Sequence, residues 1–125
     1  MKETKTNLGL VVARPGLVRD GLQAVLSAIP GLDALEPADD GASALDRLKS
    51  HRPDLVILDS SLSEGEMCTT LRQIKGQWPD VRCLVVADTP QQGRAVEAAG
   101  ADAVLVEGFS AALLSTAIKA LLGET

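Results

Sequence analysis

Five short apolar runs, each followed by a segment with apolar residues at helical spacing, constrain the fold of this 125-residue chain more than any other feature. The runs are rich in Val and Leu and lack polar alternation, which is typical of parallel strands buried on both faces. Strict alternation of strand and helix predicts one α/β domain, with a parallel sheet between two layers of helices. We predict strands at residues 8–13, 32–36, 55–59, 82–87 and 103–106.

The segments between the runs carry the apolar stripes and the end signals of helices. The stripes predict helices within residues 17–29, 67–78 and 113–121, with weaker patterns at 42–49 and 91–99. The N-terminal signals are two capping boxes and a single N-cap: Ser63 with Glu66, Thr89 with Gln92, and Ser110. The signals that end helices are Pro30-Gly31, Gly100 and Gly123.

Composition narrows the classes of function. The net charge of −5 argues against direct contact with nucleic acid, which needs clustered Lys and Arg. No apolar run approaches the roughly 18 residues of a membrane span, so we expect no membrane contact and a cytoplasmic protein. Cys68 and Cys83 lack metal-site spacing and are expected to be buried free thiols. We expect a flexible N-terminal tail at residues 1–7 and one domain at residues 8–123.

A candidate site lies at the carboxyl ends of the predicted strands. Asp59 follows the third strand, and Ala13 and Arg14 follow the first. Ala87 ends the fourth strand, and Glu107 follows the fifth. Because sites in open parallel sheets lie beyond the carboxyl ends of the strands, we expect these residues to share one edge.

Three stretches of the chain resemble a known family. They are "VVARPGLVRDGLQAVLSAIPGL", "RPDLVILDSSLSEGEM" and "AAGADAVLVEGFSAALLSTAIKALL", and with their spacing they cover roughly residues 8–122. The chain resembles the receiver domain of two-component response regulators, in the branch that usually precedes a helix-turn-helix effector. The resemblance implies a three-layer, doubly wound (flavodoxin-like) fold with a five-stranded parallel sheet of order 2-1-3-4-5. It also implies a role in phosphorelay signal transduction and transcription regulation.

In that family the aspartate at the position of Asp59 is phosphorylated by a histidine kinase. Mg²⁺, held by an acidic pair, sits beside the negative phosphoryl oxygens, while a hydroxyl and a lysine contact them. An aromatic residue on the fifth strand reports the change. Apart from Asp59, the sequence departs at every one of these positions: Ala13 and Arg14 stand at the acidic pair, Ala87 at the hydroxyl, Glu107 at the lysine and Val104 at the aromatic.

These replacements change the charge balance. Asp59 and Glu107 would face one cation, Arg14, and a unit like charge about 4 Å from a phosphoryl group costs on the order of 4 kcal/mol at an effective dielectric near 20. We therefore predict an atypical, pseudo-receiver domain that is not phosphorylated, is not an enzyme, and uses no metal or other cofactor. Its expected partner is a protein or an attached output domain, with a homodimer as a further possibility.

Several alternatives stay open at this stage. The domain could be a phosphoacceptor that still uses Asp59, or a flavodoxin-like domain that binds a small ligand. Arg14 could compensate for the lost metal by reaching Asp59, Glu107 or both, since its planar fork can accept two carboxylates. The opposite interpretation is simple decay, with Asp59 left as a capping carboxylate and Glu107 pointing to water. Asp39-Asp40-Gly41 is expected to be a turn before a helix and not a metal site.

Overall fold

The computed structural model describes residues 7–123, which form one parallel sheet of five strands in the order β2-β1-β3-β4-β5. The predicted fold class and strand order are confirmed. The strands are β1 (Leu8–Val12), β2 (Ala34–Ala38), β3 (Leu55–Leu58), β4 (Arg82–Ala87) and β5 (Ala103–Val106). The helices are α1 (Leu17–Ser27), α2 (Gly41–Ser50), α3 (Glu64–Gln77), α4 (Pro90–Ala98) and α5 (Ala111–Leu121).

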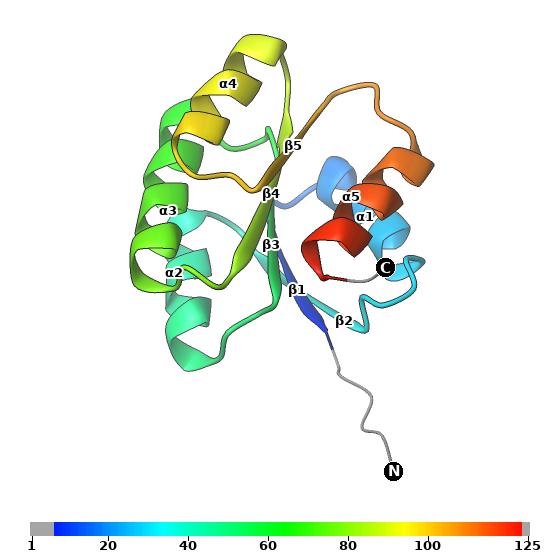
Figure 1. Cartoon of the computed structure of the whole chain (residues 1–125), viewed down its shortest axis with the longest axis horizontal. Coiled ribbons are helices and arrows are strands. Elements are labelled where there is room, and N and C mark those ends of the chain that lie inside the picture. Colours follow the sequence, from blue (N-terminus) through cyan, green and yellow to red (C-terminus); the bar gives the residue numbers. More distant parts are fainter. Residues whose placement is uncertain (1–6, 124–125) are drawn as a thin grey trace.

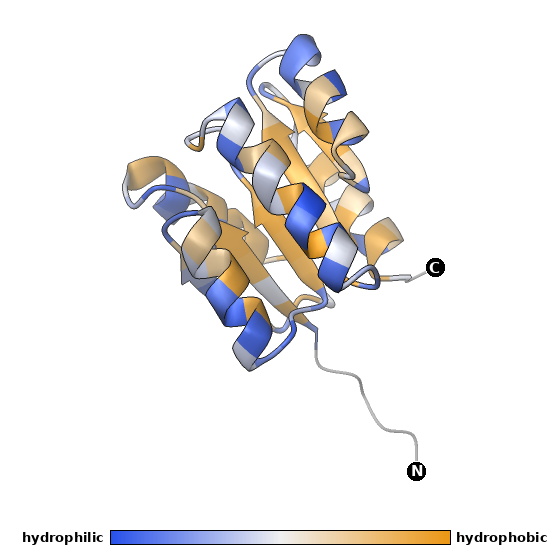
Figure 2. Cartoon of the chain, turned by 90° about the vertical axis from the view of Figure 1, so that its left-hand side faces the viewer, coloured by the Kyte–Doolittle hydropathy of each residue, from blue (hydrophilic) through white to orange (hydrophobic). Residues whose placement is uncertain are grey.

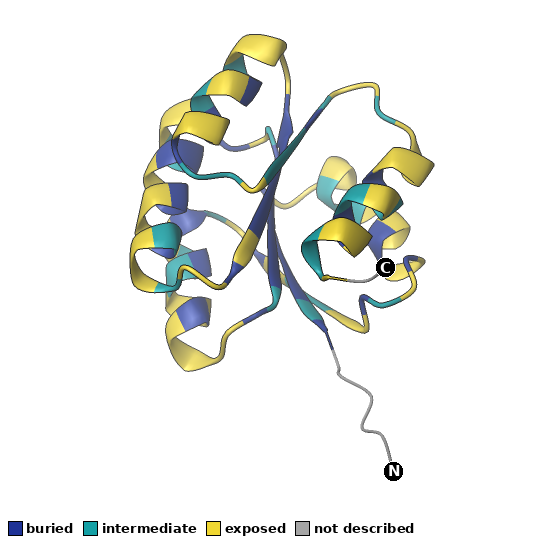
Figure 3. Ribbon diagram, viewed as in Figure 1, coloured by how far each residue is buried: buried dark blue, intermediate teal, exposed yellow. Residues whose placement is uncertain are grey.

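The helices cover both faces of the sheet. Figure 1 shows α2, α3 and α4 on one face and α1 with α5 on the other. Successive residues of β3 point to opposite faces, so that Val56 and Leu58 pack under α2–α4 while Leu55 and Ile57 pack under α1 and α5. This double burial explains why the strand runs have no polar alternation. The strands are accordingly the apolar, buried layer between helices whose outer faces are exposed (Figures 2 and 3). The outer faces of α1 and α5 also expose large apolar side chains, namely Leu17, Val18, Val25 and Leu113.

The edge strand β2 lies two residues later than predicted. Residues 32–36 were the predicted strand, whereas β2 spans Ala34–Ala38. Leu32 is buried in the core, and its N–H donates to the Ile29 carbonyl instead of joining the sheet. Pro37 fits in β2 because this strand pairs only with β1, and an edge strand tolerates a residue without an N–H.

The remaining boundaries follow the sequence signals closely. Ala13 and Asp59 come one residue after β1 and β3, although both N–H groups still donate to a neighbouring strand. Asn7 belongs to the predicted flexible tail, but it is buried and its side-chain amide donates to the Gly31 carbonyl at 2.7 Å. Residues 1–6 of that tail lie outside the described residues.

The predicted helix caps are largely confirmed. The side chains of Ser63, Thr89 and Ser110 each accept a hydrogen bond at 3.1 Å from the N–H three residues later. The capping boxes lack their reciprocal bonds, because Gln92 accepts from the N–H of Asp88 and Glu66 is used elsewhere. Gly100 and Gly123 follow α4 and α5 with φ of 120° and 77°, the left-handed region that favours glycine. Helix α1 ends at Ser27, before Pro30-Gly31.

Candidate functional site at the carboxyl edge of the sheet

Asp59 is held at the centre of the carboxyl edge and is only 3% exposed. Its N–H donates to the Val12 carbonyl at 3.0 Å, which places it between the ends of β1 and β4. Its carboxylate Oδ2 accepts a hydrogen bond from the N–H of Ser61 at 3.0 Å, while Oδ1 has no hydrogen-bond partner among residues 7–123. Asp59 is therefore a buried carboxylate with one oxygen left free for another partner.

Arg14, which stands at one acidic-pair position, has a different partner from the one we predicted. Its guanidinium Nη2 donates to Glu66 Oε1 at 2.6 Å, and Nη1 lies 3.4 Å from the Asp39 carbonyl oxygen. The predicted contact of Arg14 with Asp59, Glu107 or both is thus wrong. The backbone of Arg14 is tied to the site loop instead, because its N–H donates to the Ser61 hydroxyl at 3.0 Å.

Glu66 explains why Arg14 turns away from Asp59. Its second oxygen, Oε2, accepts from the N–H of Gly41 at 2.9 Å, so Glu66 caps the start of α2 from the first turn of α3. An acid already held at a helix N-terminus is a strong partner for a cation in reach. Sequence reasoning had singled out Glu66 only as part of a capping box with Ser63. The capping-box pattern thus singled out Glu66, but it did not predict that Glu66 would bind Arg14 and the N–H of Gly41.

A second cation, Arg19, lies in the same loop region and was missed. Its guanidinium donates to the Asp39 carboxylate and lies 3.4 Å from the Ala13 carbonyl oxygen. Asp40 caps α2 by accepting from the N–H of Ser43 at 2.8 Å, as expected for a turn before a helix. The hydrogen bonds from Ser43 lower the pKa of the Asp40 carboxyl below its ordinary value.

The family's hydroxyl, aromatic and lysine positions hold Ala87, Val104 and Glu107. Ala87 is fully buried, and its carbonyl accepts from the N–H of Glu107 at 2.9 Å. The exposed Glu107 carboxylate has one contact within residues 7–123, from the Ser60 hydroxyl at 3.4 Å. Val104 packs beneath α4, where a Cβ added at Gly93 would lie 3.2 Å from Val104 Cγ1. Helix α4 therefore sits closely on β5 at the position of the switch aromatic.

Asp59 and Glu107 do share one space. They line a pocket of about 250 Å³ between α1 and α5, whose other walls are mostly apolar. No cation among residues 7–123 forms an ion pair with either carboxylate. The other residues that line the pocket are Val18, Gly21, Leu22, Val25, Val86, Phe109, Ala111 and Leu114.

At the carboxyl edge, the two positions of the family's acidic pair carry no carboxylate that could hold a Mg²⁺ ion. Mg²⁺ requires near-octahedral oxygen ligands, usually one or two carboxylates with waters. A buried methyl group stands at Ala13, and the cationic Arg14 follows it. Nowhere in residues 7–123 do three or more His, Cys, Asp or Glu side chains gather as a metal-binding group. We derive no chemical step through a metal at this edge.

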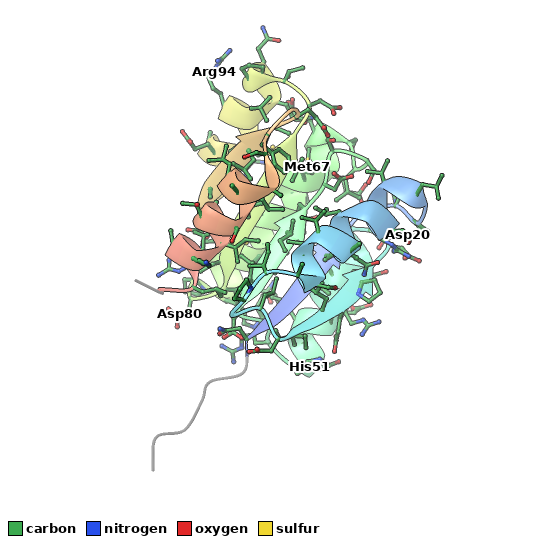
Figure 4. The ribbon with its side chains drawn as sticks, turned by 90° about the vertical axis from the view of Figure 1, so that its right-hand side faces the viewer. Asp20, His51, Met67, Asp80 and Arg94 are labelled. Carbon is green, nitrogen blue, oxygen red and sulfur yellow. The ribbon has the colours of Figure 1, made fainter. Side chains whose placement is uncertain are left out.

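Cys68 and Cys83 are both buried and not in a disulfide, as predicted. His51 is half exposed at the amino ends of the strands, 3.1 Å from the Glu36 carboxylate. It lies far from the carboxyl edge, in the part of the molecule where Figure 4 also places Asp80. Neither a thiol nor the imidazole therefore takes part in the site around Asp59.

The family of the chain follows from comparison with known proteins. The family model of the response regulator receiver domain matches residues 10–119. Among curated relatives, MprA of Mycobacterium tuberculosis, a response regulator, is 35% identical over 118 residues. DevR/DosR of the same species, a DNA-binding transcriptional activator, is 32% identical over 105 residues, and the chemotaxis protein CheY of Bacillus subtilis is 32% identical over 94 residues.

Solved structures show the same fold. A response regulator of Chloroflexus aurantiacus superposes with a TM-score of 0.85 at 22% identity, covering 96% of this chain and all of that one. The receiver domain of the regulator NarL from M. tuberculosis gives a TM-score of 0.82 at 22% identity, covering 98% of this chain and 100% of that one. At this level of identity the likeness concerns the fold alone.

The doubly wound parallel sheet of order β2-β1-β3-β4-β5 is the fold that this chain shares with these solved regulator structures. The chain belongs to the response regulator receiver domain family. The aligned regions cover 82% of this chain for DevR/DosR, 93% for MprA and 74% for CheY. They span 48% of DevR/DosR and 50% of MprA, but 78% of CheY. No helix within residues 7–123 is long and apolar enough to cross a membrane.

Proposed function

We propose that this domain is an atypical receiver that regulates an output through protein contacts, without a phosphoryl group and without Mg²⁺. The observation that carries the proposal is the position of Arg14, whose guanidinium is engaged by Glu66 where the family has an acid that holds Mg²⁺. Ala13 beside it has no ligand atom in its side chain. Because Arg14 is already paired with Glu66 and no carboxylate stands there to hold Mg²⁺, the charge on an incoming phosphoryl group would lack a counter-cation.

The surroundings of Asp59 support the same proposal. Glu107, at the lysine position, lines the same pocket as Asp59 and adds a negative charge instead of a positive one. Buried Ala87 has no hydroxyl to bond a phosphoryl oxygen. Each replacement therefore opposes a separate part of the family's reaction. We infer that the domain catalyses no reaction of its own.

The relatives indicate what such a domain would regulate. DevR/DosR is a DNA-binding transcriptional activator, and the aligned region spans about half of it. We propose that this domain acts on a transcriptional output, either attached or in a separate partner, and that the output makes the contact with DNA. A homodimer is a further way in which the domain would control such an output.

Phosphorylation by acetyl phosphate tests the proposal. The protein is incubated with acetyl phosphate and Mg²⁺, and its intact mass is measured. A variant that restores the family residues (Ala13→Asp, Arg14→Asp, Ala87→Thr and Glu107→Lys together) is the matched control, with its folding checked by circular dichroism. We expect the mass of one phosphoryl group on the restored variant only. Beryllofluoride, a phosphoryl analogue, should likewise bind only to the restored variant, which NMR spectra would show.

Each other outcome counts against the proposal. A phosphoryl group on the unmodified protein, lost in Asp59→Asn, would establish a working phosphoacceptor. A folded restored variant that stays unmodified would show that these four residues are not the cause.

A further inference from the structure

The pocket between α1 and α5 combines an apolar lining with two acidic side chains. Its walls are mainly apolar side chains, while Asp59 and Glu107 both line it. Figure 4 looks onto this face, with α1 and α5 lying side by side and Asp20 at the outer part of α1. The residues Val18, Leu22 and Val25 recur at helical spacing along α1 and form its α1 wall.

Asp59 is the residue that makes this a candidate binding site and not only a surface hollow. It is 3% exposed, and its Oδ1 accepts no hydrogen bond within residues 7–123. An ionised carboxylate in an apolar setting is costly unless it is paired and hydrogen-bonded. Arg14 does not pair with it, because Arg14 is bound to Glu66. Asp59 Oδ1 is not among the fully covered atoms that lack a hydrogen-bond partner within residues 7–123, so this oxygen is accessible and a cation in the pocket would pair with it.

The lining also specifies the rest of the ligand. Phe109 lines the pocket, and an aromatic face favours a cation as well as an apolar group. Leu22, Val86 and Leu114 offer only apolar contact to the body of a ligand. The volume of about 250 Å³ equals that of about eight waters at about 30 Å³ each, which is below the usual range for drug-sized ligands. The space suits one small ring or a short branched chain.

We propose that this pocket binds a small organic amine: a protonated ammonium group that pairs with Asp59 and Glu107, carried on an apolar body that lies between α1 and α5. The amine would occupy the carboxyl edge in place of the family's metal and phosphoryl group. It would thereby bridge α1, the residue after β3, strand β4, the β5–α5 loop and α5, which together carry the lining residues. The proposal goes beyond the proposed function and does not depend on it.

The probe for the test is 2-phenylethylamine, which carries a charge and an apolar ring. Two controls separate these parts: 2-phenylethanol keeps the ring without the charge, and ammonium chloride keeps the charge without the ring. Titrations are followed by amide chemical shifts in ¹⁵N NMR spectra at neutral pH. We expect saturable shifts with 2-phenylethylamine at millimolar concentration, centred on α1, Asp59, Glu107 and Phe109. Both controls should bind at least about tenfold more weakly.

Variants test the two carboxylates and the space separately. Asp59→Asn keeps the acceptor for the Ser61 N–H but loses the charge, and Glu107→Gln loses the second charge. Each should weaken binding about tenfold, or about 1.4 kcal/mol. The matched control is Glu97→Gln, which removes an exposed carboxylate on α4, outside the pocket. It should leave the affinity unchanged.

Gly21 allows the pocket to be filled without any change of charge. It lines the pocket, and a Cβ added there would have no atom within 4 Å. Gly21→Leu should therefore fold and abolish binding, whereas Gly76→Leu, at an equally open position of α3, should bind like the parent. Equal binding of the amine and the alcohol, unsaturable shifts, or a normal affinity in Gly21→Leu would each overturn the proposal. Its outcome is independent of the acetyl phosphate experiment, which involves no amine.

Discussion

Glu66 uses both of its carboxylate oxygens, and each one ties α3 to a different part of the carboxyl edge. Oε1 binds the guanidinium of Arg14, and Oε2 accepts the first free N–H of α2 at Gly41. Its side chain is 23% exposed, while that of Arg14 is 50% exposed. The ion pair is thus partly screened by water, but the bond to the Gly41 N–H satisfies a helix end.

Replacing Glu66 with Ala should lower the free energy of unfolding by about 1 to 2 kcal/mol. The loss combines a charge-assisted bond to a helix N–H with a partly exposed ion pair. Urea unfolding followed by the fluorescence of the single Trp78 measures it. Glu64→Ala is the matched control, because Glu64 lies exposed in the same first turn of α3. A loss in Glu66→Ala no larger than in Glu64→Ala would contradict the assignment.

Urea unfolding also distinguishes the observed ion pair of Arg14 with Glu66 from the hypothetical pair of Arg14 with Asp59. A double-mutant cycle of Arg14→Ala with Glu66→Ala should give a coupling of about 0.5 to 1 kcal/mol. A cycle of Arg14→Ala with Asp59→Ala should stay below about 0.3 kcal/mol, within the error of additivity. The reverse order of the two couplings would restore the compensation hypothesis.

Cys83 should be inert to alkylation in the folded protein. Burial raises the pKa of its thiol from 9.0 to about 12, with a smaller opposing effect from Lys75. At pH 8 only roughly one thiol in ten thousand is then ionised, and the thiolate is the reactive form. Iodoacetamide should modify Cys83 in a Cys68→Ala variant only after urea is added. Rapid labelling without urea would contradict the burial of this thiol.

The raised pKa also sets the sign of a pH dependence. The unfolded chain loses the proton of Cys83 near the ordinary value of 9.0, while the folded protein keeps it up to about 12. The contribution of Cys83 to stability is therefore complete below about pH 9 and is lost as the pH rises towards about 12. Cys83→Ala should show a flatter fall of stability in that range.

At the scale of the elements, α2 and α3 meet too closely for a side chain at Gly41. A Cβ added there would lie 2.2 Å from Thr70 Oγ1, on a buried side chain. No other helical glycine has so close a neighbour within residues 7–123. This close approach lets the Gly41 N–H reach Glu66, so the site depends on the packing of these two helices.

Gly41→Ala should destabilise the protein by about 1 to 3 kcal/mol, the usual cost of overpacking. The second variant, Gly41→Ala with Thr70→Ala, removes the colliding hydroxyl and should recover part of that loss. Gly76→Ala in α3 is the control, since its Cβ meets nothing within 4 Å, and it should stabilise by up to about 1 kcal/mol. Thermal unfolding measures all three. Equal effects at residues 41 and 76 would refute the close contact.

At the scale of the whole molecule, the two positions that couple the site to the α4–β5 face in the family carry no hydroxyl and no aromatic ring here. The family's hydroxyl and aromatic positions hold Ala87 and Val104, and Val104 is packed under Gly93 of α4. Both contribute apolar contact only. We therefore expect one resting arrangement of this face, whatever the state of Asp59.

Asp59→Asn should change amide chemical shifts around the pocket and leave those of α4 and β5 unchanged. The reason is that the substitution removes a charge but keeps the acceptor for the Ser61 N–H. ¹⁵N NMR spectra of the two proteins give the comparison, with Glu97→Gln on α4 as a reference for shifts on that face. Widespread changes along α4 in Asp59→Asn would mean that Asp59 still acts as a switch.

The fold was accessible from local patterns in the sequence. Continuous apolar runs such as residues 55–58 report burial on both faces, and the caps at Ser63, Thr89 and Ser110 mark where helices begin. Each of these patterns involves only a few neighbouring residues, so it can be recognised in the sequence before the tertiary structure is known. The strand order came from family resemblance. The predicted position of the edge strand β2 was two residues too early, because Leu32 packs in the core on the α1 and α5 side and is not part of the strand.

The positions of Asp59 and Glu107 at one edge also followed from strand polarity alone, but their partners did not. Arg14 lies 52 residues from Glu66 in the chain, and several carboxylates were available to it. Which one it meets depends on where α2 and α3 place Gly41 and Glu66. The pocket with Phe109 likewise requires α1 and α5 to lie side by side. Sequence by itself determined the layers and the edge, because periodicity and strand direction are local properties. Only the tertiary structure decided the contacts at that edge, because they join side chains brought together by packing.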